Sequence, residues 1–559
     1  MTQFPLKRGS SILIALAIAF LSACNHIPDH ARYIPKDAVV VGSIDFKSLS
    51  KKVAWNVITG SKLFKEMQAR IPEKNTQDAL NGIEKAGLDF ANTFYVYVKT
   101  DNRFKGGNRI TGLAPLSDAA AWEAFVKKVF PQVEVKQNGD IKEASLGRDM
   151  YVGWNKNLLI VINVMPATPD YANMAMGGSG AAAEKPALDM TTISAEMGNA
   201  FNVTKENSIV GNKRFTILET EGHDITFWVN YEQLMNQVSG SMAEKMSMNL
   251  AQALWKDAAF AAGFDFKTGK ITGDMHYYMS DEMKDIGVEL GAANADKDMI
   301  DRLPSANMDM MAAMHLSPKG IKAILEKMNL LGIANLGLSA QGTNVESVLD
   351  AFTGDMAFVM NDFSLHNENV TDNFMGQTVV RQNQKPSLTM TYVMKINKKE
   401  NFQKLVKMGK DLGLQSMGNG FVIPIDDKDS VYIMINDQYA IASNKYANAN
   451  GFLQGSFKSQ KMTEPASSTI PGHPWAFYFD IQQFCKNIDA GISHSAHDSL
   501  MINESKKLLN NVSLTGGAFK NSAFEYHIDI NFMNTEENSI IELMDYSMKM
   551  NDANKLNGQ

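Results

Sequence analysis

The feature of this 559-residue chain that most constrains its fold is an internal repetition of predicted elements. An apolar strand that leads directly into a helix occurs at residues 34–57 and again at residues 303–331, with shorter versions at 225–238 and 470–488. The strand pairs and helices around these units follow in the same order in both halves of the chain. A repeat of this length predicts two pseudo-equivalent domains rather than a solenoid, whose repeats are far shorter.

Length and composition agree with two globular domains. One hydrophobic core rarely grows beyond about 250–300 residues, and a content of 45% hydrophobic and 21% charged residues is ordinary for a globular protein. We expect a signal peptide over residues 1–23, a lipidated tether over 24–33, a first domain over 34–298 and a second domain over 299–559.

Hydrophobic periodicity predicts the layers within each domain. Strand-like runs joined as hairpins indicate antiparallel sheets, and helical stripes at 122–130, 231–238, 321–328 and 402–406 each supply an apolar face. The expected fold class is therefore α+β, with two tandem pseudo-equivalent domains, each a mainly antiparallel sheet with helices packed on one face.

The first two dozen residues predict where the protein is located. They read MTQFPLKRGSSILIALAIAFLSAC, with a basic start, an apolar run from Ile12 to Phe20 and small residues before Cys24. The run is too short to span a bilayer, as in a signal peptide. Small residues before cysteine resemble the bacterial lipobox, which implies cleavage before Cys24 and its acylation, and several acyl chains give lasting attachment to the lipid bilayer. An ordinary secretory signal with an incidental cysteine is the alternative.

Charge, cysteine and methionine content bear on the class of partner. The formal net charge is −7 and no basic block stands out, so we expect no nucleic-acid partner. The chain has two cysteines, and lipidation of Cys24 would leave Cys485 without a partner in the same chain. We therefore expect no disulfide framework. Cys485 lies on an apolar helical stripe and is expected to be a buried thiol rather than a nucleophile. The 35 methionines are expected mainly to fill cores, although methionine also lines adaptable binding surfaces.

Asp45, Asn230 and Asp480 stand where predicted strands turn into helices, a place where catalytic carboxylates often lie. An amide occupies the same place as the two carboxylates, and Gln233 and Gln483 follow at the spacing of a capping box. We therefore interpret the three residues as helix caps and expect no catalytic residue and no cofactor.

His494, His497 and Asp498, with His473 nearby, form a weak candidate for a metal site. A helix would place the two neighbouring histidines on one face, but Gly491 favours a loop and a fixed third ligand is missing.

The opening PDHARYIPKDAVVVGSIDFKSLSKK and the later LDAFTGDMAFVM resemble a family of Bacteroidota lipoproteins defined by a domain of unknown function. The resemblance covers essentially the whole mature chain, rests on structural motifs and carries no catalytic residue to this sequence. Surface-exported lipoproteins of that group usually bear an acidic run after the lipidated cysteine, whereas residues 25–28 here read NHIP. The resemblance therefore implies the periplasmic face of the outer membrane rather than surface display.

Two functional classes follow. We favour a non-enzymatic binding or scaffolding lipoprotein whose partner is a protein, a peptide or an envelope polymer; the alternative is a hydrolase with an unrecognised site and an envelope or periplasmic substrate. The expected contact regions are loops at residues 100–108, 166–190 and 364–386, which are long and polar. A pocket with convergent titratable groups would favour the hydrolase, and an apolar groove or flat patch between the copies would favour the binding protein.

Overall fold

The computed structural model describes residues 27–69, 77, 82–100, 108–147, 150–165, 190–235, 254–374, 377–425, 429–489 and 496–557. Contacts divide the chain into two compact units. The first comprises residues 1–54, 67–237 and 261–264, and the second comprises residues 55–66, 238–260 and 265–559.

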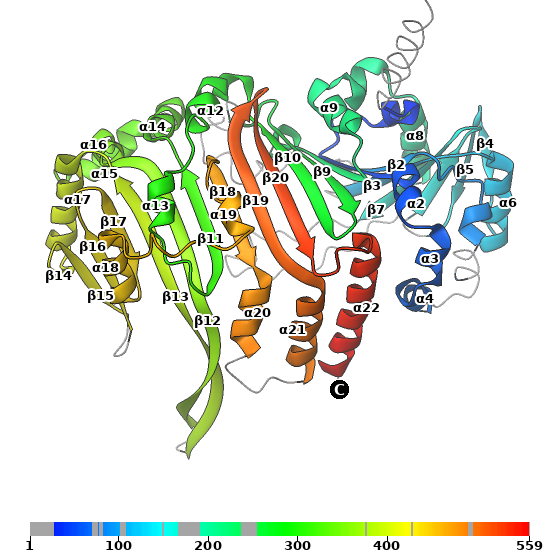
Figure 1. Ribbon diagram of the computed structural model, residues 1–559. Coiled ribbons are helices and arrows are strands. Elements are labelled where there is room, and N and C mark those ends of the chain that lie inside the picture. The colour runs from blue at the N-terminus through cyan, green and yellow to red at the C-terminus, as the bar shows by residue number, and fades with distance from the viewer. Residues whose placement is uncertain are drawn as a thin grey trace, which may run out of the picture. The chain divides into compact units, whose positions relative to one another are not determined.

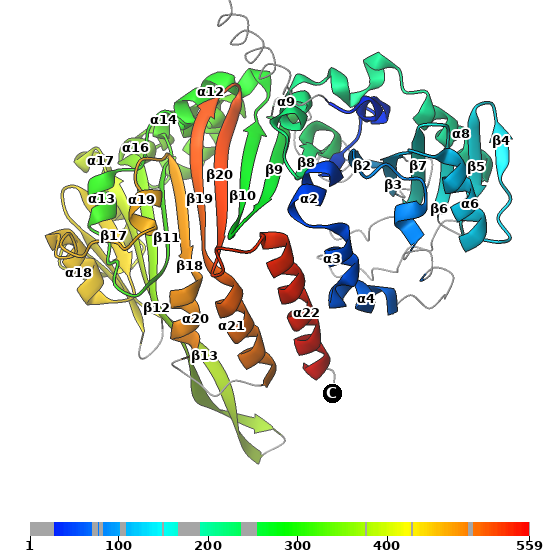
Figure 2. The same ribbon diagram turned by 45° about the vertical axis from the view of Figure 1, so that its right-hand side comes forward.

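Both repeats are built on antiparallel strands (Figures 1 and 2). The strands of the first repeat are β1 (Val40–Asp45), β2 (Thr93–Thr100), β3 (Asn108–Pro115), β4 (Lys136–Asn138), β5 (Ile141–Ser145), β6 (Met150–Trp154), β7 (Leu158–Met165), β8 (Ile225–Asn230), β9 (Ala259–Lys267) and β10 (Lys270–Tyr278). Those of the second are β11 (Met308–His315), β12 (Phe352–Phe374), β13 (Gln377–Ile396), β14 (Gln415–Met417), β15 (Gly420–Pro424), β16 (Ser430–Ile435), β17 (Tyr439–Ser443), β18 (Trp475–Asp480), β19 (Leu509–Lys520) and β20 (Ala523–Phe532).

The order of strand pairing is the same in the two repeats. In the first, neighbours run β8–β1–β2–β3–β7–β6–β5–β4. In the second they run β18–β11–β12–β13–β17–β16–β15–β14. Adding ten to each strand number converts the first series into the second, so the predicted duplication is confirmed at the level of strand order.

The helices follow the same plan. They are α2 (Phe46–Lys52), α3 (Trp55–Gly60), α4 (Lys62–Ala69), α6 (Ala119–Val129), α8 (Met190–Phe201), α9 (Lys213–Glu221), α12 (Lys284–Leu290), α13 (Lys297–Asp301), α14 (Pro318–Lys327), α15 (Leu331–Ser339), α16 (Val345–Asp350), α17 (Lys399–Asp411), α18 (Tyr446–Gln454), α19 (Ala466–Thr469), α20 (Ile481–Asp489), α21 (Ala496–Leu508) and α22 (Ser539–Asn557). With the antiparallel sheets they make the predicted α+β fold.

Residues 29–33 of the expected tether are folded. They form the 3-10 helix η1 (Asp29–Tyr33), in which Ala31 is buried. The His30 ring bonds through Nε2 to the carbonyl oxygen of Thr93 at 2.7 Å. Folded residues of the first unit therefore begin close in the sequence to Cys24, which itself lies outside the described residues.

One hydrophobic core of the second repeat lies on one face of strands β11, β12, β13, β17 and β18. Strand β11 reads MDMMAAMH, so apolar side chains point to both faces of the sheet. On one face, Met311 and Ala313 are fully buried. They pack with neighbouring strands and with α13, α18 and α19 through Val359, Val393, Ala476, Tyr478, Met299, Ile300, Phe452 and Ala466. Figure 1 shows α13 and α19 over these strands.

The predicted helical stripes at 122–130 and 402–406 pack against strands, as expected. Trp122 and Val126 of α6 are buried against strands β5 to β7, and Phe402 of α17 is buried beside Ile396 of β13. Ile324 of α14 packs with residues of the neighbouring α12, helix on helix. Residues beyond 235 in the stripe at 231–238 lie outside the described residues.

Residues 364–386 are a β-hairpin rather than the expected loop. Strands β12 and β13 remain paired from Ser364 opposite Ser387 to Phe374 opposite Gln377. The register shifts after Asn361, where Asp362 has a positive φ of 54°. Hydrophobic alternation is the main strand signal in a sequence, and this ribbon is polar, so the pattern indicated a loop. Residues 101–107 and 166–189, which hold most of the other two expected loops, lie outside the described residues.

Strand β10 pairs antiparallel with β20 along its whole length within the second unit. Lys270, the first residue of β10, lies opposite Asn531, and Tyr278, its last residue, lies opposite Ala523, the first residue of β20. The central positions of both strands, Asp274 and His527, therefore lie directly opposite each other.

The central pair is an ionic cluster. His527 Nδ1 lies 2.7 Å from Asp274 Oδ1, and its Nε2 lies 3.5 Å from Asp529 Oδ2. Lys270 donates to Asp529 at 3.0 Å. The hydrogen bond with Asp529, reinforced by Asp274, raises the pKa of His527 to about 9, and the same bond lowers the pKa of Asp529 to about 2. The imidazolium form of His527 is therefore held at neutral pH.

We predict that His527 stabilises the fold below pH 6.5 and ceases to do so as the pH rises through about 9. The folded-state pKa lies above the ordinary value of about 6.5, so the contribution is complete below 6.5 and is lost through the folded-state pKa. His527→Gln should lower the midpoint of urea unfolding at pH 6 and change it less at pH 10. Equal losses at both pH values would contradict the ionic role.

Candidate functional site

The three residues at strand-to-helix turns are helix caps, as predicted. Asp45 accepts a hydrogen bond from the Ser48 backbone N–H at 3.0 Å. Asn230 Oδ1 accepts from the Gln233 N–H at 3.1 Å, and Asp480 Oδ1 from the Gln483 N–H at 2.8 Å. Each side chain satisfies a backbone donor that a helix start leaves without an intrahelical partner.

The remaining candidates from the sequence do not converge on a site. His497 and Asp498 lie at the start of α21, whereas His494 and the lipidation candidate Cys24 lie outside the described residues. Across the described residues, His, Cys, Asp and Glu side chains do not come together in any group of three or more that could hold a metal ion. Cys485 is a buried free thiol, as predicted, and its burial raises its pKa.

Asp309 is a buried carboxyl group that the sequence did not single out. Burial raises its pKa to about 6, and its side chain is 0% exposed. One oxygen accepts from the Phe363 N–H at 2.8 Å and the other from Asn487 Nδ2 at 2.8 Å. Both oxygens join β11 to neighbouring elements, so we assign Asp309 a structural role.

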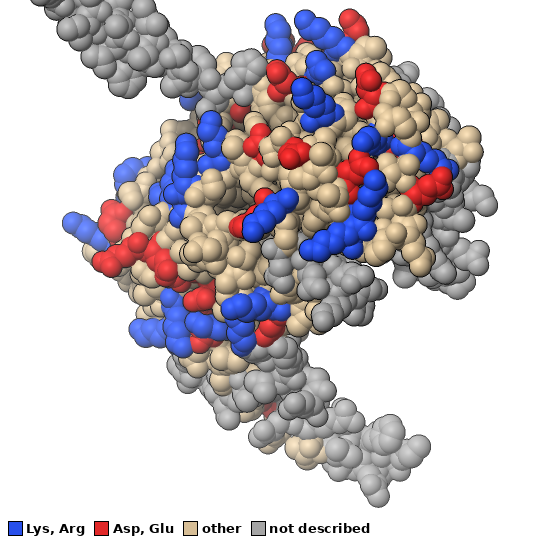
Figure 3. Space-filling model, turned by 90° about the vertical axis from the view of Figure 1, so that its right-hand side faces the viewer, with Lys and Arg blue, Asp and Glu red and all other residues tan. Residues whose placement is uncertain are grey.

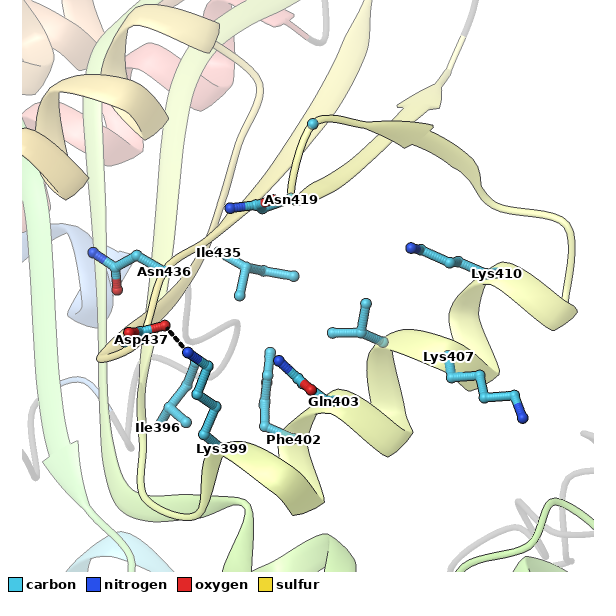
Figure 4. A pocket seen from close by; sticks show the side chains of 12 residues that line it. Ile396, Lys399, Phe402, Gln403, Lys407, Lys410, Asn419, Ile435, Asn436 and Asp437 are labelled. Carbon is cyan, nitrogen blue, oxygen red and sulfur yellow. Dashed lines mark ion pairs between the residues drawn. The ribbon is translucent and has the colours of Figure 1, made fainter.

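A pocket of about 410 Å³ lies beside α17 in the second unit (Figure 4). Its apolar wall consists of Ile396 from β13, Phe402 and Val406 from α17, and Ile435 from β16. Ile396 and Phe402 are each 7% exposed, and Phe402 packs edge-on against Phe352 with ring centroids 5.5 Å apart. The wall is therefore part of the core and is fixed in place.

The rim of the pocket is cationic. Lys399, Lys407 and Lys410 of α17 line it, together with one carboxylate, Asp437, in the turn between β16 and β17. Lys399 Nζ and Asp437 Oδ1 are 2.5 Å apart, so this carboxylate is already paired. Polar side chains complete the lining: Gln403, Asn419 and Asn436. Apart from the Lys399–Asp437 ion pair the lining holds lysine and no second carboxylate, so the pocket favours an anion.

The pocket could not be found from local motifs. Its lining comes from residues 396–410, 418–419 and 435–437, which are brought together by the pairing of β13 with β17 and of β17 with β16. The one available signal was the amphipathic pattern of α17, in which lysines flank the stripe at 402–406.

A second feature is an apolar surface on the same sheet, which we call the methionine-aromatic face. It consists of three rows of directly opposed residues on β13, β12, β11 and β18: Met390, Met360, Met310 and Phe479; Tyr392, Phe358, Ala312 and Phe477; Met394, Met356, Met314 and Trp475. The face continues toward the pocket, because Met394 lies opposite Ala440, and Ala440 lies opposite Ile435.

Surface charge is mixed where the molecule is viewed from its side. In Figure 3, Lys and Arg are interspersed with Asp and Glu among uncharged residues, without a field of one sign. Within the described residues, no helix combines the length and apolarity needed to cross a bilayer.

Comparisons with known proteins give little guidance. No protein-family model matches the chain, and no curated protein matches it. Among solved structures, TP0453 in its crystal form IV covers 46% of this chain and 83% of its own, with 10% identity and a TM-score of 0.24. Its crystal form III covers 45% of this chain and 81% of its own, with 11% identity and a TM-score of 0.25. Likeness at this level carries no argument about function.

We predict that Asp480 acts through its cap alone. Asp480→Ala should lower the free energy of unfolding by about 1 kcal/mol, because a backbone donor loses its acceptor, whereas Asp480→Asn should keep the stability of the parent. Asp118, the N-cap of α6, accepts hydrogen bonds from the Ala120 and Ala121 N–H groups. Asp118→Ala and Asp118→Asn therefore serve as a matched pair of control variants at another cap. Urea unfolding measures both, and a loss in Asp480→Asn as large as in Asp480→Ala would show that the carboxylate has a further role.

Proposed function

We propose that this protein is a lipid-anchored lipoprotein of the cell envelope, facing the periplasm from the outer membrane, which binds a partner protein and is not an enzyme. The observation that supports the binding role is the methionine-aromatic face. This patch lies on strands of the second repeat, whereas a groove or flat patch between the two copies was named above as the feature that would favour a binding protein.

The exposure of this face contrasts with that of the opposite side of the same strands. Met390 is 43% exposed and Tyr392 is 37% exposed, and the other members of the face are partly buried. On the opposite side, Met311, Val359 and Val393 are each 0% exposed. Strands that are apolar on both faces are usual where both faces are covered, so the second face is suited to a cover supplied by a partner.

The composition of the face favours a protein partner. The cores of protein interfaces are enriched in methionine and aromatic residues and depleted of charged ones, and the face has this composition. Methionine side chains adapt to the shape of a partner, and a contiguous exposed apolar patch is typical of an interaction site. A surface that lies on a bilayer usually adds lysine or arginine beside its apolar residues, and the three rows contain neither.

We predict that the methionine-aromatic face contacts a protein in the envelope. A photoreactive phenylalanine analogue introduced at Tyr392 should yield a discrete protein adduct on irradiation of intact cells, because that ring is exposed within the face. Val288, an apolar residue of α12 that is 58% exposed, is the matched control and should yield none. Adducts at both positions, or adducts with lipid alone at Tyr392, would contradict the proposal.

We predict that Cys24 anchors the protein. Cys24→Ser should release the chain from the membrane fraction or leave it uncleaved, because the acyl chains that hold it in the bilayer would no longer be attached. Fractionation followed by mass determination of the N-terminal peptide measures the change. Membrane association that persists in a correctly cleaved Cys24→Ser chain would contradict the assignment.

A further inference from the structure

The pocket beside α17 combines two surfaces that suit different parts of one ligand. Its volume of about 410 Å³ falls within the range of about 300–1,000 Å³ for small-molecule sites. The apolar wall consists of Ile396, Phe402, Val406 and Ile435, and lysines of α17, the helix that supplies two of these residues, line the rim. A ligand that fills it needs an apolar body and a negative charge.

The lysines are not equivalent. Lys399 is neutralised by Asp437. In Figure 4, the Lys410 side chain reaches from α17 toward the pocket, whereas the Lys407 side chain points away from it. Among the described residues, no carboxylate forms an ion pair with either of these two lysines, and both side chains are exposed. Lys410 is therefore the cation available to a ligand, and Lys407 is a matched control on the same helix.

Polar groups near the wall can orient the head group. The Gln403 amide lies on α17 between Lys399 and Lys410, and it points into the pocket in Figure 4. An amide N–H donates to an anionic oxygen, and a lysine ammonium adds a charge-assisted hydrogen bond.

We propose that this pocket binds a small anionic amphiphile, a single alkyl chain that carries one anionic head group. Lys410 and Gln403 hold the head group, and the alkyl chain lies against Phe402, Val406 and Ile435. Burial of the chain supplies affinity in proportion to the apolar area removed from water, and the ammonium group selects the anion over a neutral alcohol.

Calorimetric titration of the mature chain, residues 24–559, tests this site. The chain carries Cys24→Ser so that no acyl group of its own competes, and the probes are decanoate, decanol and vesicles of phosphatidylglycerol. We expect saturable binding of decanoate that is stronger than binding of decanol and that weakens as sodium chloride rises, because salt screens exposed charges. Decanoate binding without vesicle binding identifies a free anion as the ligand source, and binding of both identifies the shared head-group chemistry.

Variants on α17 identify the residue that holds the anion. Lys410→Met should weaken decanoate binding by about tenfold through loss of a charge-assisted hydrogen bond, whereas Lys410→Arg should keep most of the affinity and Lys407→Met should change it by less than about twofold. Urea unfolding midpoints equal to that of the parent show that the variants remain folded. Equal losses in Lys410→Met and Lys407→Met, equal affinity for decanoate and decanol, or binding to vesicles alone would overturn the proposal.

Discussion

The antiparallel ladder between β10 and β20 is the interaction on which the second unit depends. It joins the closing hairpin of the first repeat to the closing hairpin of the second, so the boundary between compact units differs from the boundary between repeats. Because β10 pairs with β20 along its whole length, the central residues of the ladder, Asp274 and His527, lie directly opposite each other. A second aspartate opposite Asp274 would repel it. The pairing of Asp274 with His527 replaces that repulsion with an ionic hydrogen bond.

Further along the same sheet, strands β11, β12, β13 and β18 are apolar on both faces, and the two faces are used differently. One face forms a closed core under α13, α18 and α19. The other is left partly exposed as the methionine-aromatic face and becomes covered by α17 near β16. The pocket lies where that cover begins, since Ile396 and Ile435 lie on the same face as Met394. The proposed protein contact and the proposed ligand site are therefore neighbouring parts of one apolar surface.

Short-range physical chemistry made part of the fold predictable. Caps at Asp45, Asn230 and Asp480 depend on a side chain and a backbone N–H three residues away, so spacing alone identified them. The stripes of α6 and α17 follow from helical periodicity in the same way. The hairpin at 364–386 was missed because its pairing is made by the backbone, whose hydrogen bonds are independent of side-chain polarity.

By itself the sequence determined the α+β class, the duplication and the order of elements, because these depend on periodicity and on the repetition of local patterns. Tertiary structure decided which apolar face became core and which stayed open, since β11 presents methionine to both sides and nothing local distinguishes them. It also decided the position of the pocket, because Lys410 of α17 and Ile435 of β16 line one cavity only when β13, β17 and β16 pair. The same holds for Asp274 and His527, which only the register of two distant hairpins places opposite each other.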